Sequence, residues 1–121
     1  MHWTTICIFV AVIAVIILLK RTGQVSSAEA LAHLNRGALV IDVRTPAEYS
    51  AGHLPSAINL PLDQIETALP RNLKNKSQVL LLHCQSGTRS GEAKKKLNAL
   101  GYSNVFNLGS YGRAEEIVGG R

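Results

Sequence analysis

The stretch from Gln78 to Gly101, QVLLLHCQSGTRSGEAKKKLNALG, decides the fold because it joins two different apolar patterns through one short loop. Its first part is a continuous apolar run, which is typical of a strand buried on both faces of a parallel sheet. Its last part has Ala93, Leu97 and Leu100 at the i, i+4, i+7 spacing of a helix with one buried face. A strand, a loop and a helix in this order indicate one unit of an α/β fold.

The same alternation continues on both sides of this unit. Ser26 and Glu29 have the capping-box spacing, so a helix is expected to begin near Ser27. The other expected elements are a strand over 38–44, a short helix started by Pro46, a strand over 57–60, a helix from about Leu62, a strand over 104–108 and a terminal helix over 111–120. The fold class predicted from this order is α/β, with an open parallel sheet flanked by helices.

The N-terminal segment is strongly apolar, with no polar residue between Ile6 and Leu19 and with Lys20 and Arg21 directly after it. This pattern predicts one transmembrane helix, and the positive-inside rule then places the rest of the chain in the cytoplasm. A cleaved signal that exports the domain is the alternative, although the flanking charges favour an uncleaved anchor. The predicted organisation is an anchor over 1–21, which contacts the membrane through residues 3–21, a linker over 22–27 and a domain over 28–121.

Composition narrows the classes of partner. The 121 residues contain 13 Lys and Arg against 8 Asp and Glu, a formal charge of +5. The basic residues are scattered and aromatic residues are few, so the pattern does not predict nucleic-acid binding. It suits a small anionic substrate, or anionic lipid near Lys20 and Arg21. The two cysteines lack the spacing of a metal site or a disulfide framework.

Cys84 stands at the carboxyl end of the predicted strand, where open α/β sheets collect their ligands. Gly87 permits a turn in which successive backbone N–H groups point at one centre, and such a nest binds an anion. The start of the following helix and the charge of Arg89 favour a thiolate over a thiol. The sequence therefore predicts a reactive nucleophile beside an anion-binding loop. The alternative is a buried cysteine that only completes the strand.

Three stretches carry a resemblance to one family. They are DVRTPAEYSAGHLPSAINLPL over 42–62, CQSGTRS over 84–90 and LGYSNVFNLGS over 100–110. Together they make the chain from Ser26 onward similar to the single-domain rhodaneses, which are thiosulfate sulfurtransferases, and to their small phage-shock-type members. Many relatives continue with a glycine pair and a tryptophan-containing helix, whereas the only tryptophan here is Trp3.

The resemblance implies a rhodanese-like fold and a persulfide mechanism. Cys84 would take the outer sulfur of thiosulfate, release sulfite and pass the sulfur to cyanide or to a thiol. No metal or other cofactor is expected, because the loop donors stabilise a thiolate and a persulfide by themselves. The residues that the resemblance assigns to substrate binding are Gln85, Ser86, Gly87, Thr88, Arg89 and Ser90.

Four further residues match family positions, and we interpret them mainly as scaffold: Asp42, Arg44, Glu48 and His53. A catalytic base at His53 or His83 is not required, because an ionised thiolate has no proton to lose.

Two other functions stay open. Cysteine phosphatases and arsenate reductases also place an arginine after a cysteine loop, but they need five intervening residues, and only four separate Cys84 from Arg89. A membrane-tethered rhodanese module that binds a partner without catalysis is the other alternative. Such modules often lack the cysteine, whereas Cys84, Gly87 and Arg89 are all present here.

Overall fold

Four short parallel strands form one sheet in the order β2-β1-β3-β4 in the computed structural model, which describes residues 2–119. The strands are β1 Leu39–Asp42, β2 Ile58–Asn59, β3 Leu80–His83 and β4 Val105–Gly109. The helices are α1 His2–Thr22, α2 Ser27–Asn35, α3 Pro46–Ala51, α4 Thr88–Ala99 and α5 Tyr111–Gly119, with single 3₁₀ turns at η1 Leu62–Gln64 and η2 Arg71–Leu73. The predicted α/β class with a parallel sheet and flanking helices is confirmed. The terminal helix was expected to reach residue 120, which lies outside the described residues.

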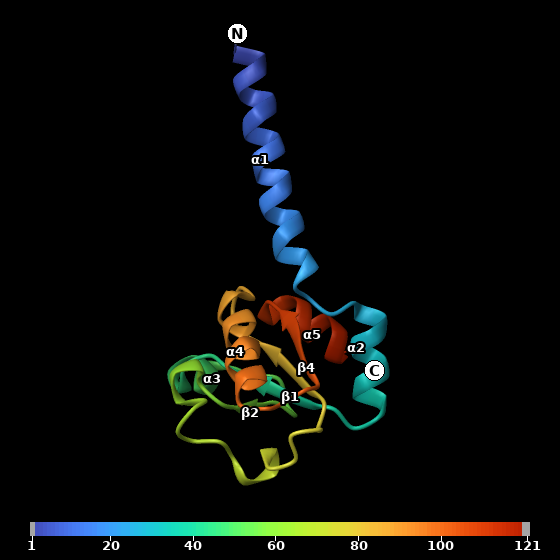
Figure 1. The fold of residues 1–121 in the computed structure, drawn as a ribbon, viewed down its shortest axis with the longest axis vertical. Coiled ribbons are helices and arrows are strands. Elements are labelled where there is room, and N and C mark those ends of the chain that lie inside the picture. Colours follow the sequence, from blue (N-terminus) through green and yellow to red (C-terminus); the bar gives the residue numbers. More distant parts are fainter. Residues whose placement is uncertain (1, 120–121) are drawn as a thin grey trace.

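Both faces of the sheet are buried, as the apolar run in its central strand β3 predicts. Alternate residues of β3 point to opposite sides, so Leu80 and Leu82 enter one core while Leu81 enters the other. Helix α4 covers the first face, and α2 and α5 cover the second (Figure 1). Cys84 continues the alternation of Leu80 and Leu82, and its side chain therefore lies on the α4 side.

Local signals start the helices as expected. The Ser26 hydroxyl accepts a hydrogen bond from the Glu29 N–H at 3.2 Å and caps α2. Thr45 and Glu48 form a complete capping box at the start of α3, where Pro46 has the fixed φ that suits a first helical turn. The capping box places Glu48 in the first turn of α3.

The prediction of a helix from about Leu62 is wrong, because this segment forms only the 3₁₀ turn η1. Ile65 is fully buried, but the residues after it, from Glu66 to Leu69, are all exposed. A short helix is marginal in water unless packing supports successive turns of one face. Here only one turn is anchored in the core, so the chain leaves the helical path.

Helix α1 extends away from the domain, and its side chains from residue 2 to residue 18 are exposed (Figure 1). Within residues 2–119 we find no helix with both the length and the apolar character needed to span a bilayer. This finding does not support the predicted transmembrane anchor over 3–21. The cytoplasmic location of the domain rests on the same segment and stays a prediction, as does the alternative of export.

Candidate active site

Cys84 lies directly after β3, at the carboxyl edge of the sheet, with its residue surface fully buried. Its sulfur accepts a hydrogen bond from the Gly87 N–H at 2.9 Å, and the Ser90 hydroxyl oxygen lies 3.5 Å from it. The Cys84 N–H donates to the Gly109 carbonyl at 3.2 Å, which ties the start of the loop to β4. The predicted nucleophile therefore sits at a strand end and faces the first turn of a helix.

Gly87 makes the turn from strand to helix. Its φ of +98° lies in the left-handed region, which side chains with a Cβ rarely adopt. A Cβ at this position would also meet the Gly109 Cα at 3.3 Å. The turn allows α4 to begin at Thr88, and the backbone N–H of Ser90 in its first turn donates towards the sulfur together with those of Gly87 and Ser86.

The pKa of the Cys84 thiol results from two opposing influences. Burial is the largest and raises the pKa. The Ser90 hydroxyl and the backbone N–H groups of Ser90, Gly87 and Ser86 act in the other direction and outweigh it, so the net pKa lies below its ordinary value. Hydrogen bonds to the charged form of the thiol therefore account for the lowered pKa.

The residues that the resemblance assigns to substrate binding lie on the active-site loop, by which we mean residues 84–90, that is, the turn after β3 and the start of α4, but their side chains make different contacts. Ser90 is buried beside the sulfur, whereas the side chains of Gln85, Ser86 and Thr88 are exposed. Arg89 forms an ion pair with Glu48, with Nη1 at 2.6 Å from Oε1 and Nη2 at 3.0 Å from Oε2.

The Glu48–Arg89 pair joins α3 to the active-site loop across 41 positions of sequence. The hydrogen bond from Arg89 and the capping contacts of Thr45 lower the pKa of Glu48 to about 2. The same pair raises the pKa of Arg89, and the nearby Cys84 thiolate adds to that effect. Both partners are therefore charged at neutral pH, about one-third of each side chain is exposed, and Arg89 presents a compensated charge at the loop.

The two histidines considered as bases lie away from the sulfur. His83 is the last residue of β3 and directly precedes Cys84, so its side chain points to the opposite face, where its ring meets Tyr111 edge to face. Burial lowers the pKa of His83, which favours its neutral form. His53 stacks on Tyr49, with ring centroids 3.7 Å apart, and its Nδ1 lies 2.8 Å from the Tyr49 carbonyl oxygen. These contacts agree with a structural role for both rings.

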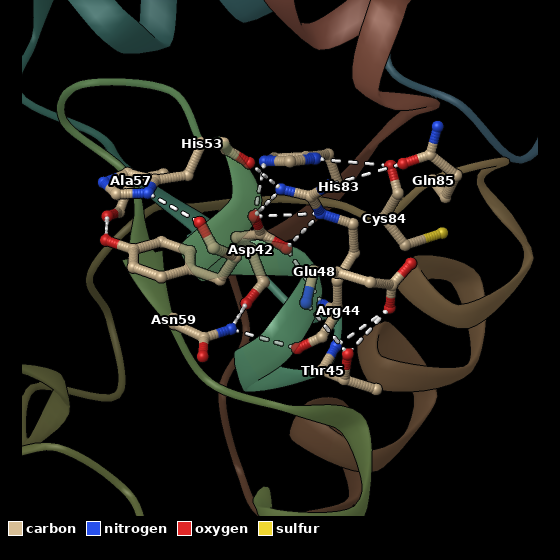
Figure 2. Close-up of polar contacts among 12 residues, drawn as sticks. Asp42, Arg44, Thr45, Glu48, His53, Ala57, Asn59, His83, Cys84 and Gln85 are labelled. Atoms are coloured by element: carbon tan, nitrogen blue, oxygen red, sulfur yellow. Dashed lines mark hydrogen bonds and ion pairs between the residues drawn. The ribbon is translucent and has the colours of Figure 1, made fainter.

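A buried ion pair supports the loop from the other side (Figure 2). The Arg44 guanidinium contacts both carboxylate oxygens of Asp42, with its closest contact at 2.8 Å, and both residues are at most 5% exposed. Its Nη1 donates to Gln85 Oε1 at 3.3 Å, and its centre lies 4.6 Å above the Tyr111 ring. The residues interpreted as scaffold thus hold one end of the active-site loop. Within residues 2–119 no cluster of three or more His, Cys, Asp or Glu side chains could hold a metal ion.

Sequence reasoning missed Asn107, a buried residue of β4 whose amide lies against the loop. Its Oδ1 is 2.6 Å from the Ser90 hydroxyl oxygen, and its Nδ2 donates to the Gly87 carbonyl at 3.2 Å. A signal was available in NVFNL, because a polar side chain inside an apolar strand requires a buried partner.

Comparison with known proteins agrees with this geometry. The model of the rhodanese-like domain family matches residues 26–112. Thiosulfate sulfurtransferase PspE of Escherichia coli is 36% identical over 69 residues, which are 57% of this chain and 66% of PspE. The thiosulfate:glutathione sulfurtransferase of Saccharomyces cerevisiae is 37% identical over 80 residues, covering 55% of this chain and 56% of the relative.

A solved structure has the same fold. The human single-domain sulfurtransferase TSTD1 superposes with a TM-score of 0.66 at 29% identity, covering 78% of this chain and 96% of that one. The chain spans between about half and two-thirds of the length of these two curated relatives. Because the family model covers most of the chain, including the Cys84 loop and the strands that hold it, the protein belongs to the rhodanese-like domain family.

Proposed function

We propose that the domain is a sulfurtransferase that carries sulfane sulfur on Cys84 and takes it from thiosulfate. The Cys84 thiolate attacks the outer sulfur of thiosulfate and forms a new S–S bond. The original S–S bond breaks, and its electron pair leaves on sulfite. The terminal sulfur of the Cys84 persulfide carries the negative charge, at a place where the loop N–H groups and the Ser90 hydroxyl can donate to it.

The second half of the cycle returns the enzyme to its starting state. Cyanide, or the thiolate of an acceptor, attacks the terminal sulfur of the persulfide. The enzyme S–S bond breaks, thiocyanate or an acceptor persulfide leaves, and the electron pair remains on Cys84 as a thiolate. Both halves conserve charge and require neither a proton transfer nor a redox partner.

The observation that carries this proposal is the hydrogen bond from the Gly87 N–H to the Cys84 sulfur at 2.9 Å. A thiol that served only as core packing would not need a left-handed glycine and a helix start aimed at it. The names of PspE and of the yeast relative support thiosulfate as the donor and a thiol as an acceptor.

The two alternatives have less support. Four residues separate Cys84 from Arg89, one fewer than the cysteine phosphatases need to surround a tetrahedral phosphate. A non-catalytic module has no use for the hydrogen bonds that lower the pKa of the Cys84 thiol.

A direct test is mass spectrometry of the purified protein after incubation with thiosulfate. We expect one added sulfur atom on the peptide that contains Cys84, and its loss on addition of cyanide with formation of thiocyanate. An exposed second cysteine, Cys7, serves as an internal control and should stay unmodified. Hydrolysis of an aryl phosphate without any persulfide would instead assign the protein to the phosphatases.

The charge of Arg89 provides a second test of the site. We expect Arg89→Ala to weaken thiosulfate binding roughly 10- to 100-fold, because a hydrogen bond to a charged group contributes about 1.5 to 3 kcal/mol. The variant should also raise the pKa of Cys84, since Glu48 stays ionised and becomes an unpaired negative charge near the thiolate. The measurements are thiosulfate kinetics and the pH dependence of iodoacetamide labelling of Cys84. Wild-type labelling should persist below neutral pH.

The double variant Arg89→Ala with Glu48→Gln is the matched control. It removes both charges, so the labelling profile should return towards that of the wild type while thiosulfate binding stays weak. Unchanged kinetics and labelling in the single variant would contradict a role for Arg89 at this site.

A further inference from the structure

Asn107 uses its whole side-chain amide to connect β4 with the active-site loop, although it lies 17 positions from Ser90 in the sequence. Its Oδ1 accepts from the Gly109 N–H at 2.8 Å, which orients the amide so that Nδ2 faces the Gly87 carbonyl. The backbone carbonyl of Asn107 accepts a hydrogen bond from the Val25 N–H at 2.9 Å, so the main chain at this position is fixed as well. The side chain is therefore fixed and can serve as a reference for the position of the loop.

Gly87 and Ser90 contact this amide, and both also reach the sulfur. Gly87 donates its N–H to the Cys84 sulfur and presents its carbonyl to Asn107. The Ser90 oxygen lies 2.6 Å from Asn107 Oδ1, 3.1 Å from the Gly87 carbonyl oxygen and 3.5 Å from the sulfur. Its single proton can be donated to one acceptor at a time, so while the hydroxyl donates to Oδ1 and anchors the first turn of α4, the backbone N–H of Ser90 is the group that donates to the sulfur.

Packing alone does not hold this loop. It borders a cavity of about 530 Å³, and Ser86, Gly87 and Thr88 all line that space together with Asn107. Ser86 and Thr88 are exposed, so the loop has room to shift away from the sulfur. Polar contacts from a rigid strand are therefore needed to keep the donors in position.

We propose that Asn107 is a positioning residue, which holds Gly87 and Ser90 where the backbone N–H groups of both can donate to the Cys84 sulfur. This inference gives a residue of β4 a part in the proposed sulfur transfer, and for its functional meaning it rests on that proposed function. Asn107 acts through the loop and does not itself contact the sulfur.

The test is the pH dependence of iodoacetamide labelling of Cys84 in a Cys7→Ser background, where Cys84 is the only cysteine. Asn107→Ala should raise the labelling midpoint by about one pH unit, which corresponds to about a tenfold slower labelling at a pH below the midpoint. Without the Asn107 amide, the N–H groups of Gly87 and Ser90 can move away from the thiolate, so its negative charge is less stabilised. An unchanged or lowered midpoint in the folded variant would overturn the proposal.

Two variants of other residues separate positioning from general damage to the strand. Asn104, which directly precedes β4, also donates from its Nδ2 to a backbone carbonyl, that of Ser77 at 2.8 Å. Asn104→Ala should therefore leave the labelling midpoint unchanged. In a Ser90→Ala background, Asn107→Ala should shift the midpoint less than it does when Ser90 is present, because part of its effect passes through that hydroxyl. Equal shifts in both backgrounds would contradict this coupling.

Asn107→Ser keeps one hydrogen-bonding group and covers the case in which the alanine variant does not fold. It should move the midpoint in the same direction by a smaller amount, and no movement would count against the proposal. Labelling requires no sulfur donor, so the outcome is independent of sulfurtransferase activity. If the wild type forms no thiocyanate but the labelling shifts occur, the sulfurtransferase proposal fails and the positioning role stands.

Discussion

Replacing Cys84 with serine should reduce thiocyanate formation from thiosulfate and cyanide to background, a loss of at least about 10³-fold. A serine hydroxyl stays protonated near neutral pH and cannot carry a persulfide. The fold should survive, because serine fits the volume of the buried cysteine and can accept the same hydrogen bond from the Gly87 N–H. Steady-state thiocyanate assays and the thermal unfolding midpoint measure the two effects.

Cys7→Ser is the matched control. Cys7 lies on the exposed helix α1, far from the loop in sequence, and its replacement should leave the activity at the wild-type level. Retained turnover in the Cys84→Ser protein, or equal losses in both variants, would show that the sulfur is not carried on Cys84.

The largest expected effect on stability comes from Asp42→Ala. The substitution leaves the Arg44 guanidinium buried without its carboxylate partner, and breaking such a pair costs roughly 3 to 5 kcal/mol. That is a large part of the ~5 to 15 kcal/mol that stabilises a typical domain. The substitution also removes Asp42 Oδ1, which accepts a hydrogen bond from the Arg44 backbone N–H at 2.9 Å in the turn after β1. Urea unfolding measures the change in the free energy of unfolding.

Asp63→Ala controls for the loss of a carboxylate as such. Asp63 is exposed, so the free energy of unfolding should change by no more than about 0.5 kcal/mol. An Asp42→Ala protein as stable as the Asp63→Ala protein would show that the buried pair contributes little. The position of Gln85, which Arg44 also contacts, would then depend on other residues.

Much of the fold could be predicted because its signals are local. The cap at Ser26, the proline at Pro46 and the apolar spacing around Leu97 each involve residues within a few positions of one another, and each element forms where expected. One prediction failed because a local pattern was given too much weight. The segment after Leu62 has no second buried turn and forms only a 3₁₀ turn.

The candidate site likewise combines features that depend on neighbouring residues with contacts between residues far apart in the sequence. The sequence alone determined the position of Cys84 at a strand end, the left-handed turn at Gly87 and the helix start at Thr88, since these depend on consecutive residues. Only the tertiary structure decided that Glu48 neutralises Arg89 and that Asn107 holds the loop. These partners lie 41 and 20 positions away from the loop residues they contact. The order of strands in the sheet brings them together, because β1 and β4 flank β3 on its two sides, and a one-dimensional pattern does not record which strands become neighbours.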